Sequence, residues 1–186
     1  MPTLEEDEAF SRLRAKQGAG ARYDADNAPA QELAWARRGT AYFARLLNNL
    51  RDRELYSPSA VNGWTRAHVV AAVAFNARDI TRVVEAARLQ LGCVETPTAE
   101  DRIAELSYAA TLPSHALRNL FKHSEVHLNV EWRDLSNDDW QAVVIVSGSK
   151  RIPLSTTPLM RAKTIWSHAI DLGCGGQTLD IPLGIF

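Results

Sequence analysis

The sequence predicts an all-α protein, an antiparallel four-helix bundle with one small β-hairpin between the third and fourth helices. Four long segments repeat apolar residues at alternating three- and four-residue steps, which places those residues on one face of a helix. Segments that contain Pro and Gly separate them. Amphipathic helices joined in this way bury their apolar faces against one another, so a bundle is the expected architecture.

The first long helix is expected from about Ala30, where the helical spacing of apolar residues begins. Its apolar face carries Leu33, Ala36, Thr40, Phe43, Leu47 and Leu50. Pro58 and Gly63 then break the pattern, and Thr65 can cap a second helix that extends to about Leu91.

A connection that contains Pro97 leads to a short helix expected over residues 99–108, and a third long helix is expected over residues 115–135. The spacing also predicts which side chains fill the core. Representative members, one from each long helix, are Leu47, Val73, Phe121 and Ile165.

The hairpin and the last helix follow. Residues 141–147 and 150–154 are β-prone runs on either side of Gly148-Ser149. Thr157 can cap the final helix, and Pro158 suits its first position because the missing N–H there has no helical partner. Gly173 is expected to end the helix.

Residues 1–29 read as an N-terminal arm, and residues 30–186 as the bundle domain. Thr3 and Glu6 fit a capping box for a short helix to about Lys16, and residues 17–29 are rich in Gly, Ala and Asp, as loops are. The arm is predicted to be an appendage or an interface segment, and a homodimer is one possible assembly.

Composition excludes several classes of partner. Hydrophobic residues make up 46% of the 186 residues and charged residues 23%, as in water-soluble globular proteins. The balance of 21 basic and 22 acidic residues gives no excess charge to attract nucleic acid or anionic lipid. The longest strictly apolar run, residues 69–75, is far shorter than the roughly 20 residues that span a bilayer.

The compartment predicted from the sequence is the cytoplasm. The first eight residues include four acidic side chains, where a secretory signal would carry positive charge followed by an apolar stretch. Cys93 and Cys174 could form one disulfide, but a reducing cytoplasm favours free thiols.

Two segments carry a resemblance to a known family. Gly-Trp-Thr-Arg-Ala-His at residues 63–68, with the helical pattern up to residue 77, resembles the second helix of the mycothiol-dependent maleylpyruvate isomerase family. Residues 160–173, which contain Ile165-Trp166-Ser167-His168, look like the fourth helix of the same family. The similarity extends over about residues 32–182. It implies the N-terminal helical domain of that family, which is DinB-like, and a cis–trans isomerase of maleylpyruvate or a similar unsaturated dioxo diacid from aromatic catabolism.

The resemblance also implies a metal site from which this sequence departs. The family binds a metal through a histidine four residues after the one in Gly-Trp-Thr-Arg-x-His and through a Glu-x-x-x-His pair on the fourth helix. Here the corresponding residues are Ala72, Thr164 and His168. One imidazole is a poor metal site, because tight binding normally takes three or four protein ligands. We therefore expect no tightly bound metal or cofactor, with mycothiol or glutathione as a thiol co-substrate.

The same resemblance suggests the site residues. His168, His68 and Arg102 are the candidate catalytic residues, with Arg102 also positioned to bind a substrate carboxylate through its guanidinium fork. The candidate substrate-binding residues beside it are Asn76, Trp166 and Thr164.

Ordinary structural roles compete with each assignment. His168 shares a polar stripe with Arg161, Thr164 and Asp171 that could simply face solvent, and Arg102 could be a surface arginine. His68 could be an unremarkable residue of a first helical turn, or a substitute metal ligand. His123 and His127 are four residues apart, so a relocated metal site is an alternative, although such pairs usually face solvent.

Three functions are therefore compared: a thiol-dependent isomerase, a metal-independent enzyme with altered acid–base chemistry on a related carboxylic acid, and a non-catalytic bundle that binds a small acid or a partner protein. Metal content and thiol dependence separate the first two. Turnover of any substrate excludes the third.

Overall fold

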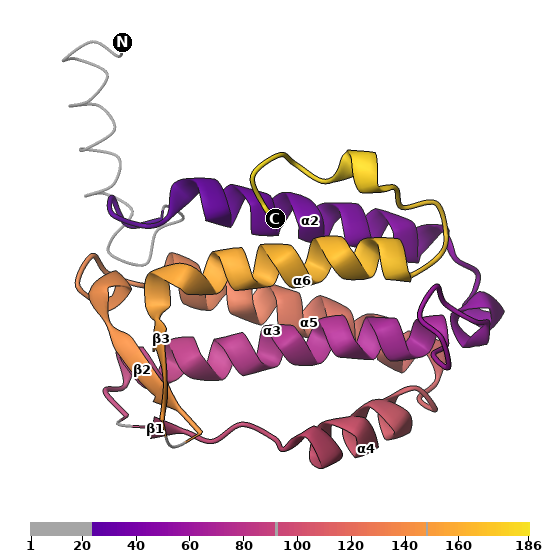
Figure 1. Cartoon of the computed structure of the whole chain (residues 1–186), viewed down its shortest axis with the longest axis horizontal. Helices are drawn as coiled ribbons and strands as arrows, with labels where there is room; N and C mark the ends of the chain where they lie inside the picture. The colour runs from indigo at the N-terminus through magenta and orange to yellow at the C-terminus, as the bar shows by residue number, and fades with distance from the viewer. Residues whose placement is uncertain (1–23, 92, 148) are drawn as a thin grey trace, which may run out of the picture.

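Residues 24–91, 93–147 and 149–186 are described by a computed structural model of the chain (Figure 1). The described residues form five α-helices: α2 (Ala30–Asn49), α3 (Arg66–Arg88), α4 (Ala99–Ala109), α5 (Ser114–Arg133) and α6 (Thr157–Asp171). Each agrees with an expected helix to within a few residues. The short helix expected in the N-terminal arm lies outside the described residues.

The long helices lie alongside one another, and their apolar faces form the core (Figure 1). The helix α2 packs on α6, α3 packs on α5, and α3 and α6 join the two pairs. The four representative core residues are at most 4% exposed, which confirms their assignment: Leu47, Val73, Phe121 and Ile165.

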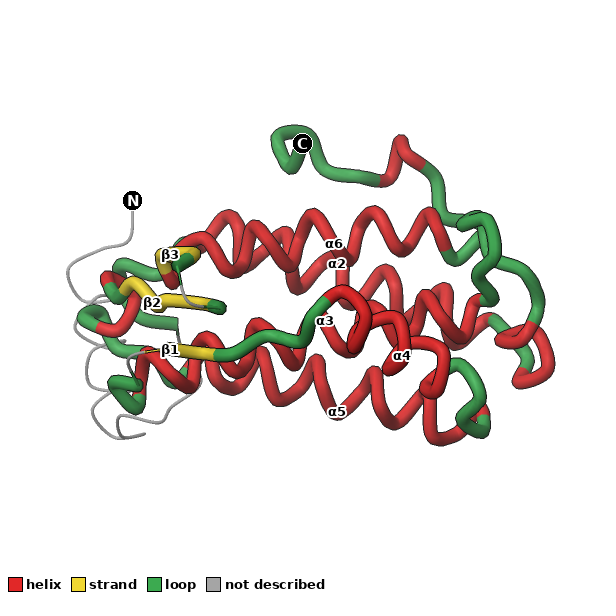
Figure 2. Tube along the Cα trace, turned by 60° about the horizontal axis from the view of Figure 1, so that its bottom comes forward, coloured by secondary structure: helices red, strands yellow, loops and turns green. Residues whose placement is uncertain are grey.

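The expectation of an all-α chain with a simple hairpin is wrong in one respect. The strands β2 (Val143–Val146) and β3 (Lys150–Pro153) pair antiparallel as expected, but β1 (Cys93–Val94) adds a third strand parallel to β2. A two-residue strand has no readable alternation, so its pairing depends on where the end of α3 delivers the chain. The sheet lies at one end of the long helices (Figure 2).

Helix boundaries follow the local capping chemistry. Thr98 accepts a hydrogen bond from the backbone of Asp101, whose carboxylate accepts one from the backbone of Thr98, so a capping box starts α4. Gly173 has φ +64° just after α6, a conformation that favours glycine, and ends that helix as expected.

The expected cap of α6 is displaced by one residue. Thr156 is the N-cap, and Thr157 is the first helical residue and is buried. The Thr157 hydroxyl donates to the carbonyl oxygen of Leu154 at 2.7 Å and accepts from Trp132 Nε1 at 3.1 Å. Packing against α5 therefore uses the hydroxyl that the sequence assigned to the cap.

The segment after α6 returns along α2, where Ile185 is 1% exposed and belongs to the core (Figure 1). Cys93 and Cys174 are both free thiols, as predicted. Within the described part of the chain, no helix is both long enough and apolar enough to span a membrane.

Candidate active site

One side of α3 carries three half-buried residues at four-residue spacing: His68, Ala72 and Asn76. Residues four apart lie one above another on a helix surface. The packed neighbour α6 contributes two half-buried residues with the same spacing, Thr164 and His168. We call these five residues the α3/α6 face.

His68 is held by the cap of its own helix. The backbone N–H of Thr65 donates to His68 Nδ1 at 3.2 Å, and the Thr65 hydroxyl lies 2.8 Å from the same nitrogen. A ring nitrogen that accepts from a backbone N–H carries no proton, so the neutral imidazole is protonated at Nε2. His68 therefore presents a hydrogen-bond donor on the side away from the cap.

His168 has the opposite arrangement. Its Nδ1 lies 2.8 Å from Oδ2 of Asp171, three residues later on α6. An ionised carboxylate only accepts hydrogen bonds, so the imidazole proton is on Nδ1 and the lone pair is on Nε2. His168 therefore presents an acceptor, which is the form a general base requires.

Trp64 brings these two imidazoles together. Its ring stacks on the His68 ring with 5.9 Å between centroids, and its centroid lies 6.5 Å from that of His168. One donor and one acceptor imidazole thus lie beside the same indole at one end of the α3/α6 face. This is the pair that proton transfer to and from a bound molecule needs.

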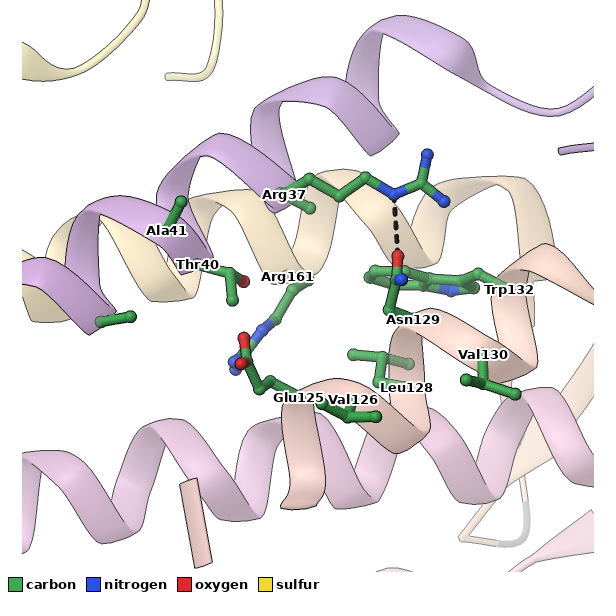
Figure 3. Close-up of a pocket in the computed structure, with 12 residues that line it drawn as sticks. Arg37, Thr40, Ala41, Glu125, Val126, Leu128, Asn129, Val130, Trp132 and Arg161 are labelled. Carbon is green, nitrogen blue, oxygen red and sulfur yellow. Dashed lines mark hydrogen bonds between the residues drawn. The ribbon is translucent and has the colours of Figure 1, made fainter. Parts of the chain in front are cut away.

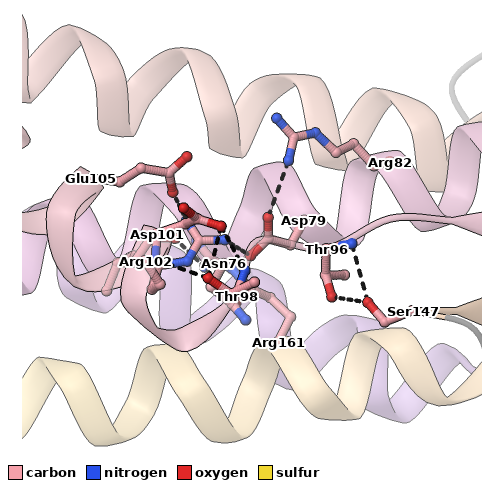
Figure 4. A network of polar contacts seen from close by, with 11 residues as sticks. Asn76, Asp79, Arg82, Thr96, Thr98, Asp101, Arg102, Glu105, Ser147 and Arg161 are labelled. Atoms are coloured by element: carbon pink, nitrogen blue, oxygen red, sulfur yellow. Dashed lines mark hydrogen bonds and ion pairs between the residues drawn. The ribbon is translucent and has the colours of Figure 1, made fainter.

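Arg102, on α4, is occupied by carboxylates (Figure 4). Its Nη2 donates to Asp79 of α3, and its Nη1 donates to Glu105 at 2.8 Å. The guanidinium also stands over the Phe75 ring, 5.3 Å from the centroid. Burial raises the pKa of Asp79 above its ordinary value, an effect that Arg102 opposes. A substrate carboxylate would therefore compete with Asp79 and Glu105 for this cation.

Asn76 is held in place by Arg161, a residue that the sequence pattern placed on a polar stripe of α6. Arg161 is only 1% exposed, and its Nη1 donates to Asn76 Oδ1 at 3.0 Å and to the Val73 carbonyl at 2.7 Å. Arg161 is therefore a core residue and does not face solvent, because its long side chain crosses from α6 to α3.

Asn76 and Asp79 also line a cavity of about 290 Å³ between α3, the start of α6 and the sheet. Polar and basic groups that line the same cavity are Thr96, Ser147, Lys150 and Thr157. The α3/α6 face thus ends in a hollow whose walls carry these polar groups among apolar side chains.

The remaining two candidates are placed differently. Thr164 is half-buried on the α3/α6 face, one turn before His168. Trp166 is 3% exposed and points to α2, where its Nε1 donates to the Trp35 carbonyl at 3.0 Å and its ring lies against Tyr42. The structure therefore does not bring Trp166 to the α3/α6 face. On the side of α2, the neighbours of Trp166 include Gly39, which has no side chain and so leaves room for the indole.

The model of the mycothiol maleylpyruvate isomerase N-terminal domain family matches residues 36–173, a range that contains the whole α3/α6 face. The chain belongs to this family. The protein is also similar to the crystal structure of a mycothiol-dependent maleylpyruvate isomerase, with a TM-score of 0.76 and 37% sequence identity. A histidine-to-alanine mutant of that enzyme matches with the same TM-score and 38% identity. No curated protein matches the chain in sequence.

These matches cover 84% of this chain but 65% of the chain of the solved enzyme. The family member described here therefore spans less than two thirds of that enzyme's length. The range matched by the family model, residues 36–173, includes the α3/α6 face.

The residues at the family's metal positions do not fit a metal. The three positions that the resemblance implies are Ala72, Thr164 and His168, which offer a methyl group, a hydroxyl and one imidazole. The Nδ1 of that imidazole is already paired with Asp171. A divalent transition metal needs at least three nitrogen, sulfur or carboxylate ligands, and this set supplies one.

His123 and His127, the alternative metal-ligand pair on α5, do not come together as a metal site in the structure. Both side chains are exposed, and His127 Nε2 faces carboxylates, at 3.3 Å from Glu85 and 3.6 Å from Glu131. These three form a group with metal-ligand atoms within 4.8 Å of one another. Arg88 lies 3.0 Å from Glu131 and supplies a positive charge there.

Two site residues escaped the sequence analysis. Asp79 follows Asn76 by three residues, so the helical spacing of the α3/α6 face could have identified it, but nothing in the sequence pairs it with Arg102. Asp171 was assigned to a polar stripe, and its role as the partner of His168 could have been inferred from their three-residue spacing.

Proposed function

We propose that the chain is a cis–trans isomerase of maleylpyruvate or a similar unsaturated dioxo diacid, working with a low-molecular-weight thiol and without a tightly bound metal. Family membership supports the reaction class. The observation that carries the proposal is the pairing of a donor imidazole, His68, with an acceptor imidazole, His168, beside Trp64. The proposal includes an antiparallel four-helix bundle of the DinB-like type, acting in the cytoplasm in aromatic catabolism.

Substrate binding is assigned to the opposite end of the α3/α6 face. The rise of an α-helix separates His68 from Asn76 by about 12 Å, with Ala72 halfway between them. A carboxylate held by Arg102 and Asn76 lets the rest of a diacid extend toward Ala72. The small side chains of Ala72 and Thr164 leave space there for the double bond and the thiol.

The proton steps follow from the two tautomers. His168 Nε2 takes the thiol proton, and the sulfur adds to the cis double bond while the conjugated ketone becomes an enolate. The Nε2–H of His68 donates to that oxygen. The former double bond is now single and rotates. The enolate then re-forms the double bond, now trans, the C–S bond breaks, and the leaving thiolate recovers its proton from His168.

A second candidate is a metal-independent enzyme that performs acid–base chemistry on a related carboxylic acid. The Asp171-His168 pair favours it, because a base oriented by a carboxylate needs neither thiol nor metal. A non-catalytic bundle that binds a small acid or a partner protein is the third reading.

The test follows the conversion of maleylpyruvate to fumarylpyruvate by metal-free protein with mycothiol, with glutathione and without thiol. The wild type is compared with His168→Ala and with His115→Ala, which removes an exposed histidine of α5. The proposal expects turnover that requires a thiol and His168 but not His115. Turnover without thiol supports the acid–base enzyme, and no turnover under any condition supports the binding protein.

A further inference from the structure

A second cavity lies on another side of the molecule, between α2 and α5 (Figure 3). These two helices are bridged at one level by Arg37, whose Nε donates to Asn129 at 2.8 Å, and at another by the Phe43 and Phe121 rings, 5.2 Å apart. The cavity has a volume of about 320 Å³, which is at the lower end of the range for small-molecule sites.

Most of the cavity wall is apolar, and three groups supply charge. The apolar lining comes mainly from Ala36, Ala41, Ala44, Val126, Leu128 and Trp132. The charged groups are Arg37, Glu125 and Arg161. Arg37 is neutralised by two hydrogen bonds to Asp24, at 2.6 and 2.7 Å. The recognition of a ligand's charge therefore rests on Glu125 and Arg161.

Arg161 differs from the other residues of this lining, because its guanidinium is fully buried and only one of its two terminal nitrogens has hydrogen-bond acceptors. The Nη1 nitrogen has two acceptors on α3, whereas Nη2 is buried and has no hydrogen-bond partner among the described residues. Burial lowers the pKa of Arg161 to about 10, so the group is still charged at neutral pH. A buried cation with a free donor is costly unless an acceptor reaches it.

Glu125 faces Arg161 in the cavity (Figure 3). Burial raises the pKa of Glu125, and this effect outweighs the lowering by Arg161 and Lys122. Its carboxyl group is therefore easier to protonate than an exposed one, and once protonated it can donate a hydrogen bond to a neighbouring anion.

We propose that the α2/α5 cavity is a binding site for a small monocarboxylic acid with an apolar body, whose carboxylate accepts hydrogen bonds from Arg161 Nη2 and from protonated Glu125. The apolar body lies against the alanines of α2 and the Trp132 ring. This site shares Arg161 with the α3/α6 face, where Arg161 holds Asn76, but it does not rest on the isomerase proposal.

The sign of the ligand's charge follows from which of the two protein groups, Arg161 or Glu125, can lose its own charge more easily. Arg161 stays charged at physiological pH, whereas the raised pKa of Glu125 makes its carboxyl group the easier of the two to neutralise when an anion binds beside it. A bound anion can therefore accept a hydrogen bond from Arg161 and another from Glu125, once Glu125 has taken up one proton. An amine would pair with Glu125 and leave Nη2 of Arg161 without an acceptor.

Binding of benzoate, measured by isothermal calorimetry on the full chain, tests the proposal, with benzylamine as the probe of opposite charge. Amide NMR shifts at Thr40, Ala44 and Asn129 locate the bound molecule. Arg161→Met should weaken benzoate binding roughly 10- to 100-fold, the loss expected for one charge-assisted hydrogen bond. Glu125→Gln, which imitates the protonated carboxyl group, should bind benzoate at least as tightly as the wild type.

A second variant leaves the buried arginine intact, because Arg161→Met could disturb folding. Ala44→Leu fills the cavity and should abolish benzoate binding, whereas Ala34→Leu, on the exposed side of the same helix, should not. Arg38→Met removes an exposed arginine of α2 and should also have no effect. The proposal is overturned if benzoate does not bind the wild type, if Ala44→Leu binds it normally, or if benzylamine binds in its place.

Discussion

His168 and Asp171 form a hydrogen-bonded pair at the end of α6, with 2.8 Å between Nδ1 and Oδ2. The carboxylate fixes the proton on Nδ1 and leaves Nε2 as a base. His168→Ala should therefore reduce turnover roughly 100- to 10,000-fold, the usual range for a general base. Asp171→Asn should also reduce turnover, because an amide can donate to Nδ1 and move the proton to Nε2. Steady-state rates at saturating thiol measure both effects, and normal rates in both variants would refute the assignment.

Arg102 is predicted to bind the substrate carboxylate by exchanging its protein partners. Arg102→Ala should raise KM roughly 10- to 100-fold, as the loss of a charge-assisted hydrogen bond does, with less effect on kcat. The matched control is Arg82→Ala, because Arg82 contacts the same Asp79 at 3.6 Å but is 54% exposed. An equal KM change in both variants would mean that the charge of the region matters and that Arg102 has no specific role.

The family's metal site should be recoverable by two substitutions. Ala72→His with Thr164→Glu places two missing ligands on the face that already holds His168, so the double variant should bind close to one zinc per chain. The wild type should hold well under one. Elemental analysis of protein purified without chelator measures both values. His127→Ala in the wild type shows whether any residual metal comes from the group of Glu85, His127 and Glu131.

Gly39 allows α2 and α6 to approach closely. A Cβ at this position would lie 2.6 Å from Ile165 Cγ2 and 2.7 Å from Trp166 Nε1. Gly39→Ala gains about 1 kcal/mol of helix propensity, but overpacking of a core costs about 1–3 kcal/mol, so we expect net destabilisation. Denaturant unfolding measures the difference, and a stabilised variant would show that the two helices can move apart freely.

The raised pKa of Glu125 predicts a pH-dependent effect on stability. The folded state holds the Glu125 proton more tightly than the unfolded state, so this residue's contribution to stability falls as pH rises from about 4.3 through its folded pKa. Glu125→Gln should therefore raise the melting temperature at neutral pH, and the gain should shrink as the pH falls through the folded pKa of Glu125 and be lost by about pH 4. Thermal melts of both proteins at matched pH values test this, and a gain that grows on acidification would contradict the sign.

The sequence alone determined the helical segments, their approximate limits and the side chains that fill the core. Positions such as Leu47 and Phe121 repeat with the period of the helix, and the burial of a helix face follows from that period whatever its neighbour is. The family resemblance likewise depended on contiguous residues around Trp64 and His168, and the family match confirmed it.

Only the tertiary structure decided the partners of the polar side chains. Periodicity assigned Arg161 to a polar stripe, yet its length carries the guanidinium across to Val73 and Asn76 in the core. Arg102 meets Asp79 from a different helix, and Trp166 turns toward α2. Helical spacing fixes a residue's direction about its own axis, but which groups lie in that direction depends on how the helices pack, and this is a property of the whole chain.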